Sequence, residues 1–130
     1  MQLDVKDTRV VQIGSHKAWA VPGAGGACIV TQTATASSGV LAGQRGTYSS
    51  CSHTNHILRR GHVGFGGEPD AELAFGLVPD GTTVVLTSPT GTHRNVPVVT
   101  NVFVVVAKPY SMTLTLHKSG GATVSFPSRV

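Results

Sequence analysis

The chain has 130 residues, the usual size of one domain with its own hydrophobic core. Charged residues make up only 12%, against roughly 25% in an average soluble domain, and the apolar content of 40% excludes intrinsic disorder. The net charge of +4 comes from scattered Lys and Arg residues, a distribution that argues against specific nucleic-acid binding.

The first half of the chain predicts a few strands and one long irregular segment. Residues 4–21 alternate loosely and favour two short strands with a turn near Gly14 and Ser15. The glycine-rich "GAGGACIV" leads into a strand from Cys28 to Thr33. Residues 34–70 are predicted to be loop-rich, with one strand at about 57–65, because small and polar residues dominate there.

The second half, residues 71–130, predicts regular hairpins. "AELAFGLV" ends at the turn signal Pro79-Asp80-Gly81, and "TTVVLTS", "HRNVPVVT", "VFVVVAK", "MTLTLHK" and "ATVSFPS" follow as strands. Pro97 predicts an edge strand or a bulge, and Asn101 a left-handed turn. The run "VFVVV" is the best candidate for a strand that is buried on both faces or that faces a partner.

Short strands at this spacing predict one all-β domain over residues 1–130: an antiparallel sandwich or a barrel-like fold of immunoglobulin-like or Greek-key type. The predicted core comprises Trp19, Ile29, Leu77, Val85, Val102, Val104, Leu114 and Leu116. No run approaches the roughly 18 apolar residues of a membrane helix, so the chain as given is not expected to span a membrane.

Several motifs occur together: "KAWAVPGAGGACIV" with its tryptophan and Val-Pro-Gly, then Cys51, then "GLVPDGTTVVL" and "VPVVTNVFVV". In this combination the chain resembles uncharacterised β-rich domains of exported or membrane-tethered actinobacterial proteins. The resemblance covers roughly residues 9–106. It implies an extracytoplasmic location and carries no assigned activity. Since no membrane segment precedes the motifs, we expect an excised domain of a longer anchored chain.

For such an exported domain, the two cysteines of the chain, Cys28 and Cys51, predict a disulfide bond. The bond would tether the loop-rich segment and stabilise the fold by roughly 3.5 kcal/mol in the chain-entropy estimate. Two free, buried thiols in a cytosolic protein are the alternative.

The segment "CSHTNHILRRGH" holds His53, His56 and His62, whose imidazole rings are weak candidates for a metal site. The spacing matches no standard zinc signature, and a cysteine in a disulfide is not a ligand. Exposed loop histidines are therefore the preferred interpretation, and no cofactor is predicted. The Gly-x-Ser-x-Gly motif of serine hydrolases is also missing from the sequence.

The loop-rich segment 34–70 supplies the predicted partner-binding residues, Tyr48, Arg59 and Arg60, because tyrosine and arginine are enriched at interfaces. The expected partner is a protein or an anionic surface. The first hypothesis is a non-enzymatic extracytoplasmic interaction or structural domain. A self-assembling subunit that uses edge-strand addition is the alternative, and a metal-binding or hydrolytic domain built on residues 51–62 is the second alternative.

Overall fold

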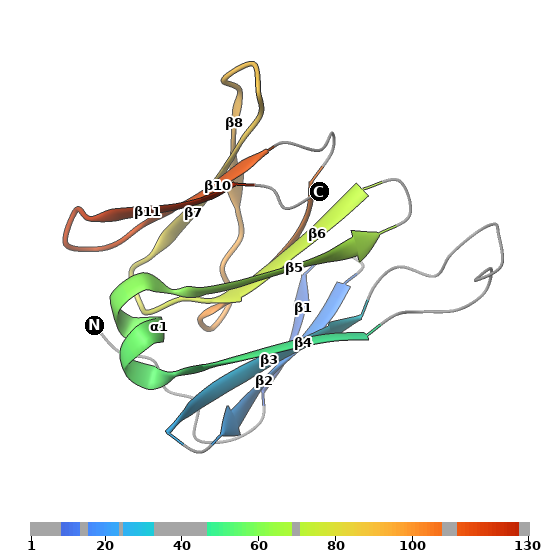
Figure 1. Cartoon of the computed structure of the whole chain (residues 1–130), viewed down its shortest axis with the longest axis vertical. Helices are drawn as coiled ribbons and strands as arrows, with labels where there is room; N and C mark the ends of the chain where they lie inside the picture. Colours follow the sequence, from blue (N-terminus) through green and yellow to red (C-terminus); the bar gives the residue numbers. More distant parts are fainter. Residues whose placement is uncertain are drawn as a thin grey trace, which may run out of the picture.

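Three antiparallel β-sheets and one short helix make up the described part of the computed structural model (Figure 1). The described residues are 9–13, 16–23, 25–32, 47–68, 71–107 and 112–127. The prediction of an all-β antiparallel sandwich is confirmed. The sheets remain open rather than closing into a barrel, and they stack in three layers instead of two.

Sheet A is a simple meander at the amino-terminal end of the fold. It consists of β1 (Arg9–Ile13), β2 (His16–Gly23), β3 (Gly26–Gln32) and β4 (Thr47–His53), in that order. Each strand pairs antiparallel with the next one along the chain, which is the arrangement that short hairpin connections favour.

Sheet B is the middle layer. The helix α1 (Thr54–Arg60) carries the chain out of sheet A and into β5 (His62–Glu68), as Figure 1 shows. β5 pairs with β6 (Ala71–Leu77), and β6 pairs with β9 (Val102–Ala107).

Sheet C is built from two hairpins and has the strand order β11-β10-β7-β8. These strands are β7 (Thr83–Thr87), β8 (His93–Val96), β10 (Thr113–His117) and β11 (Thr123–Pro127). The strand before Pro97 therefore lies at an edge of a sheet, as the proline predicts.

Sheet B is buried on both faces, because sheet A packs against one side and sheet C against the other. Val102 and Val104 of β9 belong to the core shared with sheet A, whereas Phe103 belongs to the core shared with sheet C. This confirms the prediction that "VFVVV" is buried on both faces, and it explains why the run shows no alternation of apolar and polar residues.

Six of the eight predicted core residues are buried: Ile29, Leu77, Val102, Val104, Leu114 and Leu116. The prediction was wrong for Trp19 and Val85, which are only partly buried. Both lie on the outward side of an outer sheet, since their neighbours Ala18 and Ala20, or Val84 and Leu86, occupy the inward positions.

Residues 47–68 form a strand, a helix and a strand where the sequence analysis expected mostly loop. "TYSSCSH" carries no apolar alternation, yet it pairs along its whole length with β3. Tertiary pairing thus overrides a weak local propensity. The rest of the predicted loop, residues 34–46 and 69–70, lies outside the described residues.

Asn101 holds the turn between sheets B and C. Its φ of 72° confirms the predicted left-handed conformation, and the side chain is buried. Its Nδ2 donates to the Val78 carbonyl at 2.9 Å and to Asp80 Oδ1 at 2.7 Å. The asparagine before β9 therefore fastens the Pro-Asp-Gly turn that follows β6, which links two of the motifs noted in the sequence.

Candidate functional site

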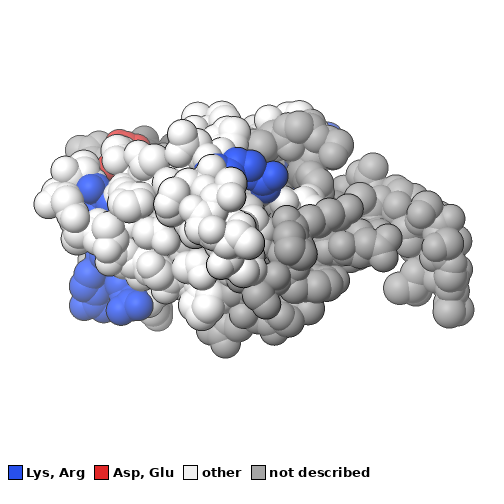
Figure 2. All heavy atoms as spheres, turned by 90° about the horizontal axis from the view of Figure 1, so that it is seen from above, with Lys and Arg blue, Asp and Glu red and all other residues white. Residues whose placement is uncertain are grey.

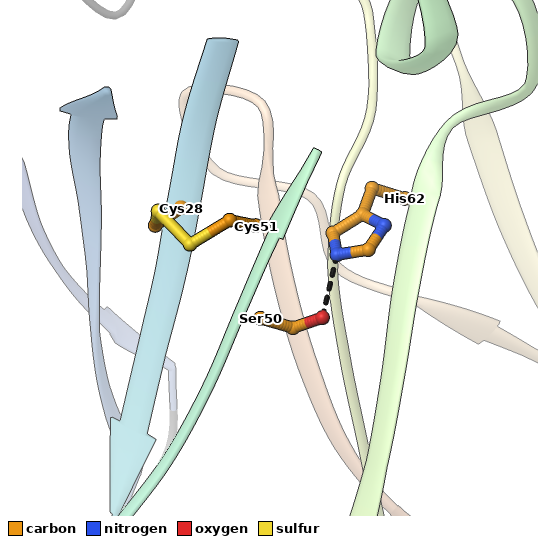
Figure 3. Close-up of a disulfide and its surroundings, with 4 residues drawn as sticks. All are labelled: Cys28, Ser50, Cys51 and His62. Atoms are coloured by element: carbon orange, nitrogen blue, oxygen red, sulfur yellow. Dashed lines mark hydrogen bonds between the residues drawn. A yellow bond between two sulfur atoms is a disulfide. The ribbon is translucent and has the colours of Figure 1, made fainter. Parts of the chain in front are cut away.

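The disulfide joins two neighbouring strands on the outward side of sheet A. Cys28 and Cys51 lie directly opposite each other in the β3–β4 register, with their Cα atoms 4.0 Å apart and their sulfurs bonded. The predicted pairing is therefore confirmed. In Figure 3 the disulfide lies on one side of β4, and Ser50 points away on the other side, towards β5.

Ser50 and His62 form a polar junction between sheets A and B. The Ser50 Oγ and the His62 Nε2 share a hydrogen bond of 2.7 Å (Figure 3). The His56 ring packs edge-on against His62, with centroids 6.5 Å apart. Burial lowers the pKa of His62, and the neighbouring His56 lowers it further, so His62 is held in its neutral form.

The three candidate histidines do not form a metal site among the described residues. His53 ends β4, His56 lies on α1 and His62 begins β5. No group of three His, Cys, Asp or Glu side chains comes together in the described ranges. A serine next to a neutral histidine also needs a third group to orient the ring for nucleophilic catalysis, and the described contacts of His62 are Ser50 and His56.

Tyr48 lies between sheets A and B. Its ring stacks on Phe75 with centroids 6.3 Å apart, and a Cβ at Gly66 would come within 2.6 Å of it. A glycine at position 66 thus leaves the room that the ring fills.

Arg59 and Arg60 are exposed in the last turn of α1, where basic side chains interact favourably with the helix dipole. Lys118 joins them, since its Nζ donates to the Leu58 carbonyl at 3.3 Å. Five residues of β4 separate Tyr48 from the helix, so about 20 Å of extended chain lies between Tyr48 and the first residue of α1. The structure therefore does not bring the tyrosine and the arginines together, and only the arginines are placed to meet an anionic partner.

The outward side of sheet A carries an apolar surface that the sequence analysis did not anticipate. We call it the Trp19 face. It consists of Val10, Trp19, Val21, Val30 and the Cys28–Cys51 disulfide. The register places Val10, Trp19 and Val30 in one row across the sheet, and Val21 and the two cysteines in the next row. Val10 is 59% exposed, the most of any large apolar residue in the described part.

A hollow of about 300 Å³ adjoins the Trp19 face at the disulfide. We call it the disulfide hollow; it is lined by Gly23, Gly26, Ala27, Cys28, Cys51, Ser52 and His53. Gly23 leaves space beside the disulfide, since a Cβ there would lie 3.9 Å from the Cys28 Sγ, and His53 places an imidazole at the border of the hollow.

One signal in the sequence could have revealed this face. Successive side chains of a strand point to opposite faces of the sheet. In "KAWAV", Trp19 therefore lies on one face and Ala18 and Ala20 on the other, and one of these two faces must be the interior one. The large ring makes the interior the natural choice for Trp19, whereas the fold buries the alanines against the bulky side chains of sheet B.

No family model, no curated protein and no solved structure matches this chain. None of the described residues form a helix long and apolar enough to cross a membrane.

Proposed function

We propose that the chain is a non-enzymatic binding module that works outside the cytoplasm and engages its partner through the Trp19 face. The observation that carries the proposal is the apolar row of Val10, Trp19 and Val30 on the exposed side of sheet A. An exposed apolar patch with polar residues at its border is typical of an interaction site.

The disulfide supports the extracytoplasmic part of the proposal. Disulfide bonds form and persist in oxidising compartments and are rare in the cytosol. Cys51 is exposed to solvent, so cytosolic reductants would have direct access to this bond.

The side chains of the site favour binding over catalysis. Its centre consists of valines, a tryptophan and a disulfide, none of which is a general acid, a base or a nucleophile. The Ser50–His62 junction lies on the opposite side of β4 and does not share this surface (Figure 3).

Co-sedimentation of the labelled protein with isolated cell envelopes of the producing organism tests the proposal. We expect the wild-type protein to sediment with the envelopes, and a Trp19→Ala/Val30→Ser variant to remain in solution. The matched control is Thr115→Ala/Ser125→Ala on the outward side of sheet C, which should sediment like the wild type. Equal sedimentation of the Trp19 variant would overturn the proposed surface.

A thiol titration of protein recovered from its native location tests the compartment. Denatured protein that works outside the cytoplasm should show no free thiol, because both cysteines are in the disulfide. Two thiols per chain would contradict this part of the proposal.

A further inference from the structure

The Trp19 face combines an apolar centre with a border of hydrogen-bonding groups, of which Lys17 is charged. Gln12 and Lys17 lie opposite each other on β1 and β2 at one end of the face. On β4, Thr47 and Ser49 continue the border, paired with Gln32 and Val30 of β3. A ligand that covers the centre therefore meets hydroxyl, amide and amine groups at its edges.

The face is too small for a stable protein interface. Its two apolar rows lie about 7 Å apart along the strands, and four strands span roughly 14 Å. A stable protein complex buries about 800 Å² of accessible surface, spread over about 20–30 residues, on each partner, whereas the Trp19 face consists of six residues. The adjoining disulfide hollow, at about 300 Å³, lies at the lower end of the sizes found for small-ligand pockets. Both measures favour a ligand of a few rings over a protein partner or a second copy of the chain.

The charge of the face favours a neutral ligand. Among the described residues on the outward side of sheet A, Lys17 is the one that carries a fixed charge. The exposed arginines at positions 59 and 60 belong to α1, at the end of sheet A rather than on its face. An anionic ligand would therefore find one cation on the Trp19 face and no cluster.

We propose that the Trp19 face binds a neutral oligosaccharide; this inference rests on the proposed function of the same surface. A pyranose ring has an apolar face of C–H groups, which the negative face of an aromatic ring attracts, and an edge of hydroxyl groups. One sugar ring stacks on the indole of Trp19, and its hydroxyl groups meet Lys17 and Ser49 at the border. The next sugar unit reaches the disulfide hollow, where the imidazole of His53 lies at the border and can hydrogen-bond a hydroxyl group.

The disulfide contributes to this binding by keeping the surface rigid. It fixes β3 to β4 directly beneath the ligand, and a surface that is ordered before binding loses less entropy when the ligand arrives. The disulfide thus keeps the binding surface ordered and contributes no polar contact to the ligand.

Calorimetric titration with two neutral probes, cellotriose and the trimer of N-acetylglucosamine, tests the inference. We expect saturable binding of at least one probe that high salt leaves unchanged, since no ion pair is involved. Trp19 is the sole tryptophan of the chain, so its fluorescence should shift upon binding. Trp19→Ala should weaken the affinity at least about tenfold, and Trp19→Phe should retain part of it, because phenylalanine keeps an aromatic face.

The control Thr115→Ala/Ser125→Ala should bind as the wild type does, and circular dichroism verifies that every variant is folded.

Three outcomes overturn the inference: neither probe binds, binding survives Trp19→Ala, or high salt abolishes binding, which would indicate an anion-binding site at the arginines. If neither probe binds but envelope sedimentation still depends on Trp19, the oligosaccharide inference fails and the proposed function stands. If sedimentation velocity instead shows a dimer that Trp19→Ala dissolves, the face is an interface between copies.

Discussion

Sheets A and C cover the two faces of the same middle sheet, yet they differ in the side chains that they turn inward and outward. Sheet A turns three alanines, Ala18, Ala20 and Ala27, against sheet B, together with Val11 and Ile29. Sheet C turns mainly larger residues inward, including Leu86, Leu114, Leu116, Val84 and Val96. Their outward sides differ as well, because sheet A carries the exposed Val10 and the partly buried Trp19 and Val30, whereas sheet C carries mainly hydroxyl groups.

The outward side of sheet C is polar and almost without charge. Its residues include Thr83, Thr87, Thr113, Thr115, Thr123 and Ser125, and Figure 2 shows that most of the described surface seen from above lacks Lys, Arg, Asp and Glu. Hydroxyl groups bind water well and provide solubility without a partner. The comparison shows that a bulky apolar residue of an outer sheet does not have to lie in the core. Since the contact of sheet A with sheet B is made by its inward residues, Trp19 on the opposite side takes no part in that core.

The largest effects should come from the two cores that sheet B shares. Phe75 packs towards sheet A and Phe103 towards sheet C, and both side chains are almost completely buried. Phe75→Ala and Phe103→Ala should each lower the free energy of unfolding by about 3–5 kcal/mol, through lost burial and a cavity. Urea denaturation measures the loss. A loss below about 1 kcal/mol for one variant would show that its outer sheet contributes little to the shared core.

Removal of the disulfide should lower the stability of the whole fold. Cys28→Ser/Cys51→Ser should destabilise the protein by about 3.5 kcal/mol, because the unfolded chain gains the freedom that the cross-link removes. Denaturant unfolding of the variant and of the reduced wild type should give the same loss. A stability equal to that of the oxidised wild type would show that strand pairing holds β3 and β4 without the bond.

The attachment of sheet C to sheet B depends on Asn101. Asn101→Gly keeps the left-handed backbone and removes both side-chain hydrogen bonds, so it should cost about 1–3 kcal/mol. Asn101→Ala should cost more, since alanine also opposes the positive φ. Thermal unfolding of both variants separates the two contributions, and equal stabilities would contradict a role for the backbone conformation.

The attachment of sheet A to sheet B should depend on pH through His62. Its pKa in the folded protein is lowered, so the unfolded chain takes up a proton first as the pH falls. The stability contribution is therefore fully present above the unfolded pKa of about 6.5 and is lost as the pH falls through the folded pKa.

Denaturant unfolding at pH 7 and pH 5 measures this smallest effect. Stability should decrease towards pH 5, and His62→Asn should reduce the decrease. The matched control is His93→Asn, which replaces an exposed histidine of sheet C, away from the junction between sheets A and B. An identical pH dependence in wild type and His62→Asn would assign the effect to other groups.

The sequence predicted the regular half of the fold well, because local patterns determine it. The turn signal at Pro79-Asp80-Gly81, the alternation in "MTLTLHK" and the continuous run in "VFVVV" each correspond to an observed feature. Pairing of β4 was not predictable in the same way, since "TYSSCSH" gains its strand conformation from β3. The Trp19 face was missed because residue size alone does not reveal which side of an outer strand faces inward.

The edge of sheet C that β8 forms affects how the protein behaves at high concentration. β8 is an edge strand of four residues, and Pro97 follows it directly. Arg94 of β8 reaches towards β9, and its Nη2 donates to the Val106 carbonyl at 3.0 Å. An added strand would have to displace that guanidinium and align with a strand too short to hold it, so the edge resists open-ended fibril growth.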